Sequence, residues 1–285
     1  MILSMTGYGK TEIQLPTKKI TIEIKSLNSK NLDLNVRTPS YFKEKELEVR
    51  KKIASSLVRG KVDFSIYVEN IGTNVSSQLN EEAIKTYMEQ LKSISGASEL
   101  ELLQMAIRLP ETIETTRGEF DETEWKEIER AIISTLEKIN KYRQDEGEVL
   151  KQDFIKRISL IHEFLSEVIE LDPQRIENVK EKLQKAILEL EVKVDENRYE
   201  QELIYYLEKL DITEEKVRLK SHLEYFLTEL NASTSNGKKL GFITQEIGRE
   251  INTIGSKANF AGMQKWVVQM KDELEKIKEQ NLNVL

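Results

Sequence analysis

Cysteine is absent from the 285-residue sequence, which excludes disulfide bonds, thiolate metal sites and a cysteine nucleophile. Phosphate-binding glycine-rich loops, Walker lysine motifs and dinucleotide fingerprints are also missing. The first residues lack a basic segment followed by an apolar run, and no stretch approaches the roughly 18 to 20 apolar residues of a membrane span. We therefore expect a cytoplasmic protein with no membrane partner.

Aromatic residues are scarce at 7%, whereas charged residues reach 33% and hydrophobic residues 39%. This balance is typical of helical proteins with long solvated faces, and the length permits one sizeable core or two smaller ones. The net charge of −7 disfavours a nucleic-acid partner, but residues 1–70 hold 13 Lys and Arg against 8 Asp and Glu. This basic first part permits contacts with a phosphate backbone without requiring them.

Apolar and polar residues alternate with a period of two in three runs within residues 1–70, which predicts strands with one buried face. The runs are centred on residues 20–24, 32–36 and 62–68, and a helical segment after Pro39 separates the second from the third. The result is a β-β-α-β unit. Its basic residues would either track phosphates or simply solubilise the surface.

The rest of the chain carries helical periodicity, so we expect an α+β protein of three parts. Residues 1–120 form an N-terminal β-rich α+β domain, residues 121–197 a long helical hairpin arm, and residues 198–285 a C-terminal helical domain. Pro173 is expected to break the long helical pattern, because proline removes a backbone donor, and so to make the turn of the hairpin. Such an arm would project or pack between subunits.

Residues 239–259 combine an apolar helical stripe with an unusual polar surface of carboxylates, amides, hydroxyls and one arginine. Glu246 and Glu250 are four residues apart and would point the same way, which suits oxygen ligands for Mg²⁺ or Mn²⁺. His222 and Glu215, on the preceding helix, could add a nitrogen ligand, a general acid or base, or a further carboxylate. Glycines at 248 and 255 indicate a close neighbour or a nearby helix end. The plainer alternative is a buried helix docking on its neighbour through small residues.

Several motifs together resemble the YicC/YloC family from the first residues nearly to the last. They are Ser4-Met5-Thr6-Gly7-Tyr8-Gly9, Lys25-Ser26-Leu27-Asn28-Ser29-Lys30 with Leu32-Asp33, Arg59-Gly60-Lys61-Val62, Asp211-Ile212 with Glu214-Glu215, Arg218-Leu219, Ser221-His222, and Gln245-Glu246 through Arg249-Glu250-Ile251-Asn252-Thr253-Ile254-Gly255-Ser256-Lys257. One departure occurs at Leu109-Pro110-Glu111, where the family leads us to expect Pro-Gly after the leucine.

The resemblance implies a cytoplasmic endoribonuclease that cuts single-stranded RNA with a divalent ion, Mn²⁺ first and Mg²⁺ as the alternative. It also implies a ring-shaped homo-oligomer, a hexamer, with other RNA-turnover nucleases as further partners. Matched residue by residue, the motif positions acquire roles from their chemistry. The expected catalytic residues are His222, Glu246, Arg249 and Glu250; the metal ligands Glu215, His222, Glu246 and Glu250; and the RNA-binding residues Asn28, Arg37, Arg59, Lys61, Arg218 and Lys257.

Two other hypotheses remain beside the metal-dependent endoribonuclease. The chain would otherwise be a non-catalytic RNA-binding adaptor that hands RNA to nucleases, or a helical scaffold. The product ends also remain open. Attack by a metal-activated water would leave a 5′-phosphate and a 3′-hydroxyl, whereas attack by the ribose 2′-hydroxyl would leave a 2′,3′-cyclic phosphate and need no metal.

Overall fold

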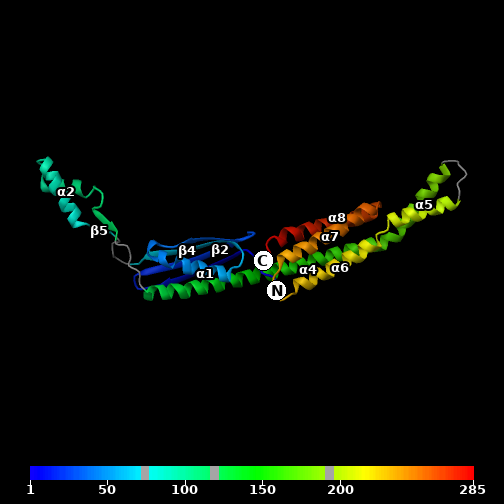
Figure 1. The fold of residues 1–285 in the computed structure, drawn as a ribbon, viewed down its shortest axis with the longest axis horizontal. Coiled ribbons are helices and arrows are strands. Elements are labelled where there is room, and N and C mark those ends of the chain that lie inside the picture. Colours follow the sequence, from blue (N-terminus) through cyan, green and yellow to red (C-terminus); the bar gives the residue numbers. More distant parts are fainter. Residues whose placement is uncertain (72–76, 116–121, 190–195) are drawn as a thin grey trace.

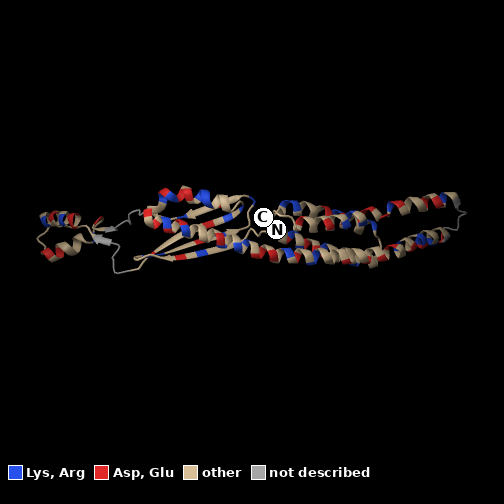
Figure 2. Ribbon diagram, turned by 90° about the horizontal axis from the view of Figure 1, so that it is seen from below, with Lys and Arg blue, Asp and Glu red and all other residues tan. Residues whose placement is uncertain are grey.

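The computed structural model describes residues 1–71, 77–115, 122–189 and 196–285. The molecule is elongated, with a sheet at one end of the helix α4 (Glu122–Glu189) and a helical bundle along the same helix farther on (Figure 1). Lys and Arg alternate with Asp and Glu along most helices, so neither end of the molecule is of a single charge (Figure 2). Both chain ends lie between sheet and bundle.

A four-stranded sheet with the order β1-β2-β4-β3 forms the first part. The first three strands in this order pair antiparallel, whereas β3 runs parallel to β4, because a short helical turn and α1 carry the chain across between them. The elements are β1 (Gly7–Gln14), β2 (Lys18–Leu27), β3 (Leu32–Arg37), the 3-10 turn η1 (Ser40–Lys45), α1 (Glu46–Ser56) and β4 (Gly60–Asn70). The predicted α+β class and β-β-α-β unit are therefore confirmed.

One face of the sheet is buried and the other is open. Isoleucines of β2 and the alternate residues of β4 pack on α1 and on the first part of α4, where Trp125, Ile128 and Ile132 lie. The strand β1 was missed by the sequence analysis because Gly7 and Gly9 stand where a buried strand would carry large apolar residues. A Cβ atom on Gly9 would lie 2.6 Å from the backbone oxygen of Thr135, so glycine lets α4 approach β1.

The helix α4 is continuous over 68 residues and contains Pro173, so the predicted break at this proline is wrong. A proline inside a helix costs about 3 kcal/mol, and contacts on both sides of Pro173 offset this cost. The buried carboxylate of Asp172 pairs with Arg175 at 2.8 Å and with Lys216 at 2.6 Å, and Arg175 also donates to the backbone oxygen of Leu210. The hairpin lies farther along the chain, where α5 (Glu196–Lys209) and α6 (Thr213–Leu230) run back beside α4 (Figure 1).

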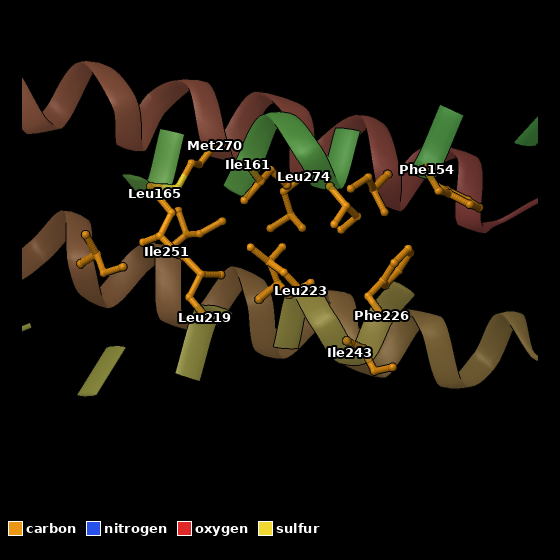
Figure 3. Packing of buried hydrophobic residues seen from close by; sticks show 14 of the residues in the cluster. Phe154, Ile161, Leu165, Leu219, Leu223, Phe226, Ile243, Ile251, Met270 and Leu274 are labelled. Carbon is orange, nitrogen blue, oxygen red and sulfur yellow. The ribbon is translucent and has the colours of Figure 1, made fainter. Parts of the chain in front are cut away.

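Four helices make the second core: the middle of α4, α6 (Thr213–Leu230), α7 (Gly237–Lys257) and α8 (Ala261–Asn281). Their apolar stripes point into one cluster, in which Phe154, Leu223, Ile251 and Leu274 come from four different helices (Figure 3). The helix α5 (Glu196–Lys209) lies outside this core, near the distal end of α4. The domain boundaries at 121 and 197 stay predictions.

The glycines of α7 face α8. A Cβ atom would lie 3.2 Å from the Cδ2 atom of Leu274 at Gly248, and 2.9 Å from the Cγ1 atom of Val267 at Gly255. These two glycines therefore allow α7 to dock closely on α8, as the plainer alternative supposed.

A small lobe contains β5 (Ser77–Leu79), α2 (Glu81–Ile94), α3 (Glu99–Ala106) and β6 (Ile113–Thr115). At the departure from the family pattern, Glu111 adopts a φ angle of 65°. This left-handed conformation favours glycine, which explains why a glycine was expected there. Among the described helices, none combines the length and apolar character that a membrane span requires.

Candidate functional site

The helices α6 and α7 lie antiparallel, and two ion pairs fix their register. Glu215 pairs with Lys257 at 2.7 Å at one end, and Glu229 pairs with Lys239 at 2.6 Å at the other. His222 is midway between the two glutamates along α6, and the turn that carries Glu246 and Glu250 is midway between the two lysines along α7. The register thus places His222 at the same level along the helix pair as the turn that carries Glu246 and Glu250.

A shallow surface pocket of about 330 Å³ lies at this level, between α6 and α7. Its lining residues are His222, Tyr225, Lys239, Phe242, Ile243 and Glu246. Two rings in it are exposed, since Tyr225 retains 43% and Phe242 60% of its accessible surface. The ammonium group of Lys239 lies 5.2 Å from the centre of the Tyr225 ring, and the hydrogen bond from this lysine to Glu229 raises its pKa.

The two carboxylates of the predicted metal pair occupy different environments. Glu246 is exposed, and its Oε2 atom lies 3.9 Å from a guanidinium nitrogen of Arg249. Glu250 is only 4% exposed, and no described residue forms a hydrogen bond with its carboxylate. The expectation that both point the same way is met only in part, because the stripe of α7 that faces the core includes Glu250 and excludes Glu246.

Glu215 and Lys257 form an ion pair with each other. The Nζ atom of Lys257 donates to Glu215 and, at 2.9 Å, to the backbone oxygen of Asp211. Glu215 is buried, and its second oxygen, Oε2, has no hydrogen-bond partner among the described residues. Its place in the first turn of α6 favours the negative charge. Arg218, one turn farther along, is exposed and pairs with Glu214.

The donor chemistry of His222, Glu246 and Glu250 fits a divalent ion such as Mn²⁺, because it combines imidazole with carboxylate oxygen. Within the described parts of a single chain, however, no group of three or more His, Asp or Glu side chains is arranged to hold a metal. Glu215 is the weakest candidate ligand because Lys257 already occupies one of its oxygens.

The four residues expected to bind RNA in the first domain are not brought together with this pocket. Asn28 donates to the backbone oxygen of Leu282, and Arg59 donates to that of Ser29 at 2.8 Å, so both take part in contacts within the chain. Arg37 and Lys61 are exposed on the open face of the sheet. Arg37 lines a hollow together with Lys25 and the two acidic residues Glu23 and Asp63. This open face is therefore of mixed charge.

A buried arginine that was not predicted lies beside these residues. Arg143 is 2% exposed and donates to Met5, to Ser26 and to the backbone oxygen of Arg59, and burial lowers its pKa to about 10. The signal was an arginine within the apolar stripe of α4, one turn after Ile139. Tyr225, Lys239 and Phe242 were also missed. The signal for Phe242 was an aromatic residue off the apolar stripe of its helix.

Comparison with known proteins gives matches along the whole chain. Residues 2–152 match the family model described as the N-terminal region of YicC-like endoribonucleases, and residues 168–285 match the model of the C-terminal region. A protein of Clostridioides difficile named probable endoribonuclease YicC is 33% identical, with all of both chains covered. A protein of Haemophilus influenzae with the same name is 28% identical, again with all of both chains covered.

Proposed function

The chain belongs to the YicC-like endoribonuclease family, and on this premise we propose that it hydrolyses phosphodiester bonds within single-stranded RNA. One structural observation carries the proposal to particular residues: His222 and Glu246, from two helices, line the same surface pocket. An imidazole and a carboxylate that line one pocket, with the exposed guanidinium of Arg249 one turn along α7, suit general acid–base catalysis on a phosphodiester.

Each of these side chains has a distinct task in the proposed reaction. His222 would move a proton at the attacking or leaving oxygen, because an imidazole can both accept and donate a proton. Arg249 would stabilise the charge that develops on the phosphoryl oxygens, and its exposure leaves it free to turn toward RNA. Glu246 would orient the imidazole or accept a proton. Arg218, exposed on α6, would contact the backbone of the strand.

We further propose dependence on a divalent ion, Mn²⁺ first and Mg²⁺ as the alternative. His222, Glu246 and Glu250 would hold it, with RNA phosphate oxygens, water or a second chain completing its ligands. When bound, such an ion acidifies water and polarises phosphoryl oxygens.

A ring-shaped homo-oligomer, a hexamer, is the third part of the proposal. Exposed apolar residues near the distal end of the long helix support self-association, since isolated monomers rarely expose such clusters. They are Ile204, Tyr205 and Tyr206 of α5. A ring could also gather the basic first parts around RNA, despite the net charge of −7 per chain. We place the enzyme in the cytoplasm, with other RNA-turnover nucleases as further partners.

A non-catalytic adaptor is the alternative, and one observation favours it. Within the described parts of one chain, the predicted metal ligands do not assemble into a group of three. An adaptor would use the same surface to bind RNA without cutting it.

The test is cleavage of an end-labelled single-stranded RNA with Mn²⁺ and with EDTA. The variants are Glu250→Gln, which keeps the shape of the buried side chain, His222→Asn, and Glu279→Gln as a control on the exposed face of α8. The enzyme hypothesis requires Mn²⁺-dependent cutting by the wild type and the control, and RNA binding without cutting by Glu250→Gln. Binding without cutting by all four would establish the adaptor. Equal cutting in EDTA would exclude the metal and leave His222→Asn as the deciding variant, with a 2′,3′-cyclic phosphate as the expected product end.

A further inference from the structure

The pocket beside His222 contains two aromatic rings to which the acid–base chemistry assigns no role. Tyr225 comes from α6 and Phe242 from α7, and both are on the solvated side of their helices. The apolar stripe of α7 runs through Leu240, Ile243 and Ile247 and passes Phe242 by. Core packing therefore does not explain the phenylalanine.

Phe242 is the most exposed ring of the pocket, with 60% of its surface accessible. Tyr225, in contrast, is held in place, because Lys239 lies 5.2 Å from its ring centre and Glu229 anchors that lysine. A fixed ring and a free ring on opposite walls offer apolar faces to a planar ligand. Aromatic faces at the surface of RNA-binding proteins stack on unpaired bases in this way.

The position of Phe242 on its helix connects it to the proposed chemistry. Glu246 is four residues farther along α7 and Arg249 seven, so all three side chains follow the same exposed face. The rise of an α-helix puts Phe242 and Arg249 about 10 Å apart along the axis. A base stacked on Phe242 and a phosphate beside Arg249 would then belong to the same or neighbouring nucleotides. The ammonium group of Lys239, on the same wall, adds a positive charge for the strand.

We propose that Phe242 and Tyr225 form a stacking subsite that holds one unpaired nucleobase beside the phosphodiester to be cut. The inference rests on the proposed function and specifies how the substrate is recognised. Stacking accepts every base, so this subsite confers little sequence preference. It does select single strands, because the bases of a duplex are stacked on their own neighbours and present no free face to the pocket.

The test measures binding in EDTA of a short single-stranded oligoadenylate and of its abasic counterpart, which keeps the sugar–phosphate backbone. Phe242→Ala should weaken binding of oligoadenylate by about 5- to 150-fold, the range expected for one stacked base, and Phe242→Tyr should restore it. Binding of the abasic strand should be the same for wild type and Phe242→Ala. Tyr142→Ala, at an exposed tyrosine on α4, is the matched control and should change neither.

The outcomes separate this inference from the proposed function. If the wild type binds neither strand in EDTA and also cuts no RNA with Mn²⁺, the proposed function and the subsite fall together. If the wild type binds and cuts RNA and Phe242→Ala does so equally well, only the subsite is overturned. If Phe242→Ala weakens binding of both strands equally, or if the mass of this variant in solution changes, the subsite is also overturned. The ring would then serve the fold or a subunit contact.

Discussion

The ion pair between Glu215 and Lys257 gives a sharp test of what two motif residues do. The family resemblance suggested a metal ligand and an RNA contact, but the structure joins the two side chains at 2.7 Å. The Glu215 side chain retains 9% of its surface and that of Lys257 31%, so the carboxylate is buried and the ammonium group partly wet. Lys257→Met would leave a buried carboxylate without its cation.

The expected loss of unfolding free energy follows from these exposures. Breaking a fully buried pair by removing one partner costs about 3–5 kcal/mol. Water that reaches the Lys257 site would lessen this cost, whereas the lost hydrogen bond to Asp211 adds about 1 kcal/mol. We therefore expect Lys257→Met to cost about 2–4 kcal/mol. Combining it with Glu215→Gln should recover part of the loss, because a neutral amide tolerates burial better than a charge.

Urea unfolding of the wild type, both single variants and the double variant gives the coupling energy directly. Lys220→Met, at an exposed lysine on α6, is the control and should lie within about 0.5 kcal/mol of the wild type. An unchanged midpoint for Lys257→Met, together with weaker RNA binding, would refute the structural role and return this lysine to the RNA-contacting set.

Three further predictions concern backbone positions. Glu111→Gly should raise the unfolding free energy by about 1 kcal/mol in urea unfolding, because the residue adopts a left-handed conformation; a loss would contradict the strain. Gly147→Ala should lower the melting temperature although alanine has the better helix propensity. The reason is that its Cβ atom would lie 2.1 Å from the backbone oxygen of Ile2, whose side chain is buried. Gly96→Ala, with open space around it, is the control. Gly255→Ala should lower the unfolding free energy, measured in urea, by about 1–2 kcal/mol, because the side chain of Val267 is branched and stiff. A gain in stability would show that α8 moves to make room for the methyl group.

Much of the fold could be predicted because its signals are local. The strands β2, β3 and β4 carry regular alternation, and α7 and α8 carry clean apolar stripes. The missed strand and the false break have a common cause in tertiary contact. Glycines in β1 matter because α4 passes over them, and the helix around Pro173 is held by Asp172, which pairs with Lys216, and by Arg175, which donates to the backbone oxygen of Leu210. Neither contact can be recognised from a short window of the sequence.

The candidate site shows the same limit more strongly. The composition of α7 marked it as unusual, and in the structure His222 and Glu246 both line one surface pocket. The register that brings them together depends on Glu215 and Lys257, which are 42 residues apart in the chain. No periodicity within either helix specifies such a register. The exposed ring of Phe242 was visible in the sequence only as one apolar residue on a polar face.

Contacts within the chain divide the motif residues into two groups with different expected consequences. Asn28, Arg59, Glu215 and Lys257 are engaged with other parts of the same chain. Replacing them should lower the stability of the protein, and it should weaken RNA binding or cleavage only through that loss. Arg218, Glu246 and Arg249 are exposed, and among the described residues they pair only with neighbours on their own helix. Such pairs are worth little in water and are easily exchanged for RNA phosphate. Losses of activity without losses of stability should therefore concentrate in this second group, on the face that α6 and α7 share.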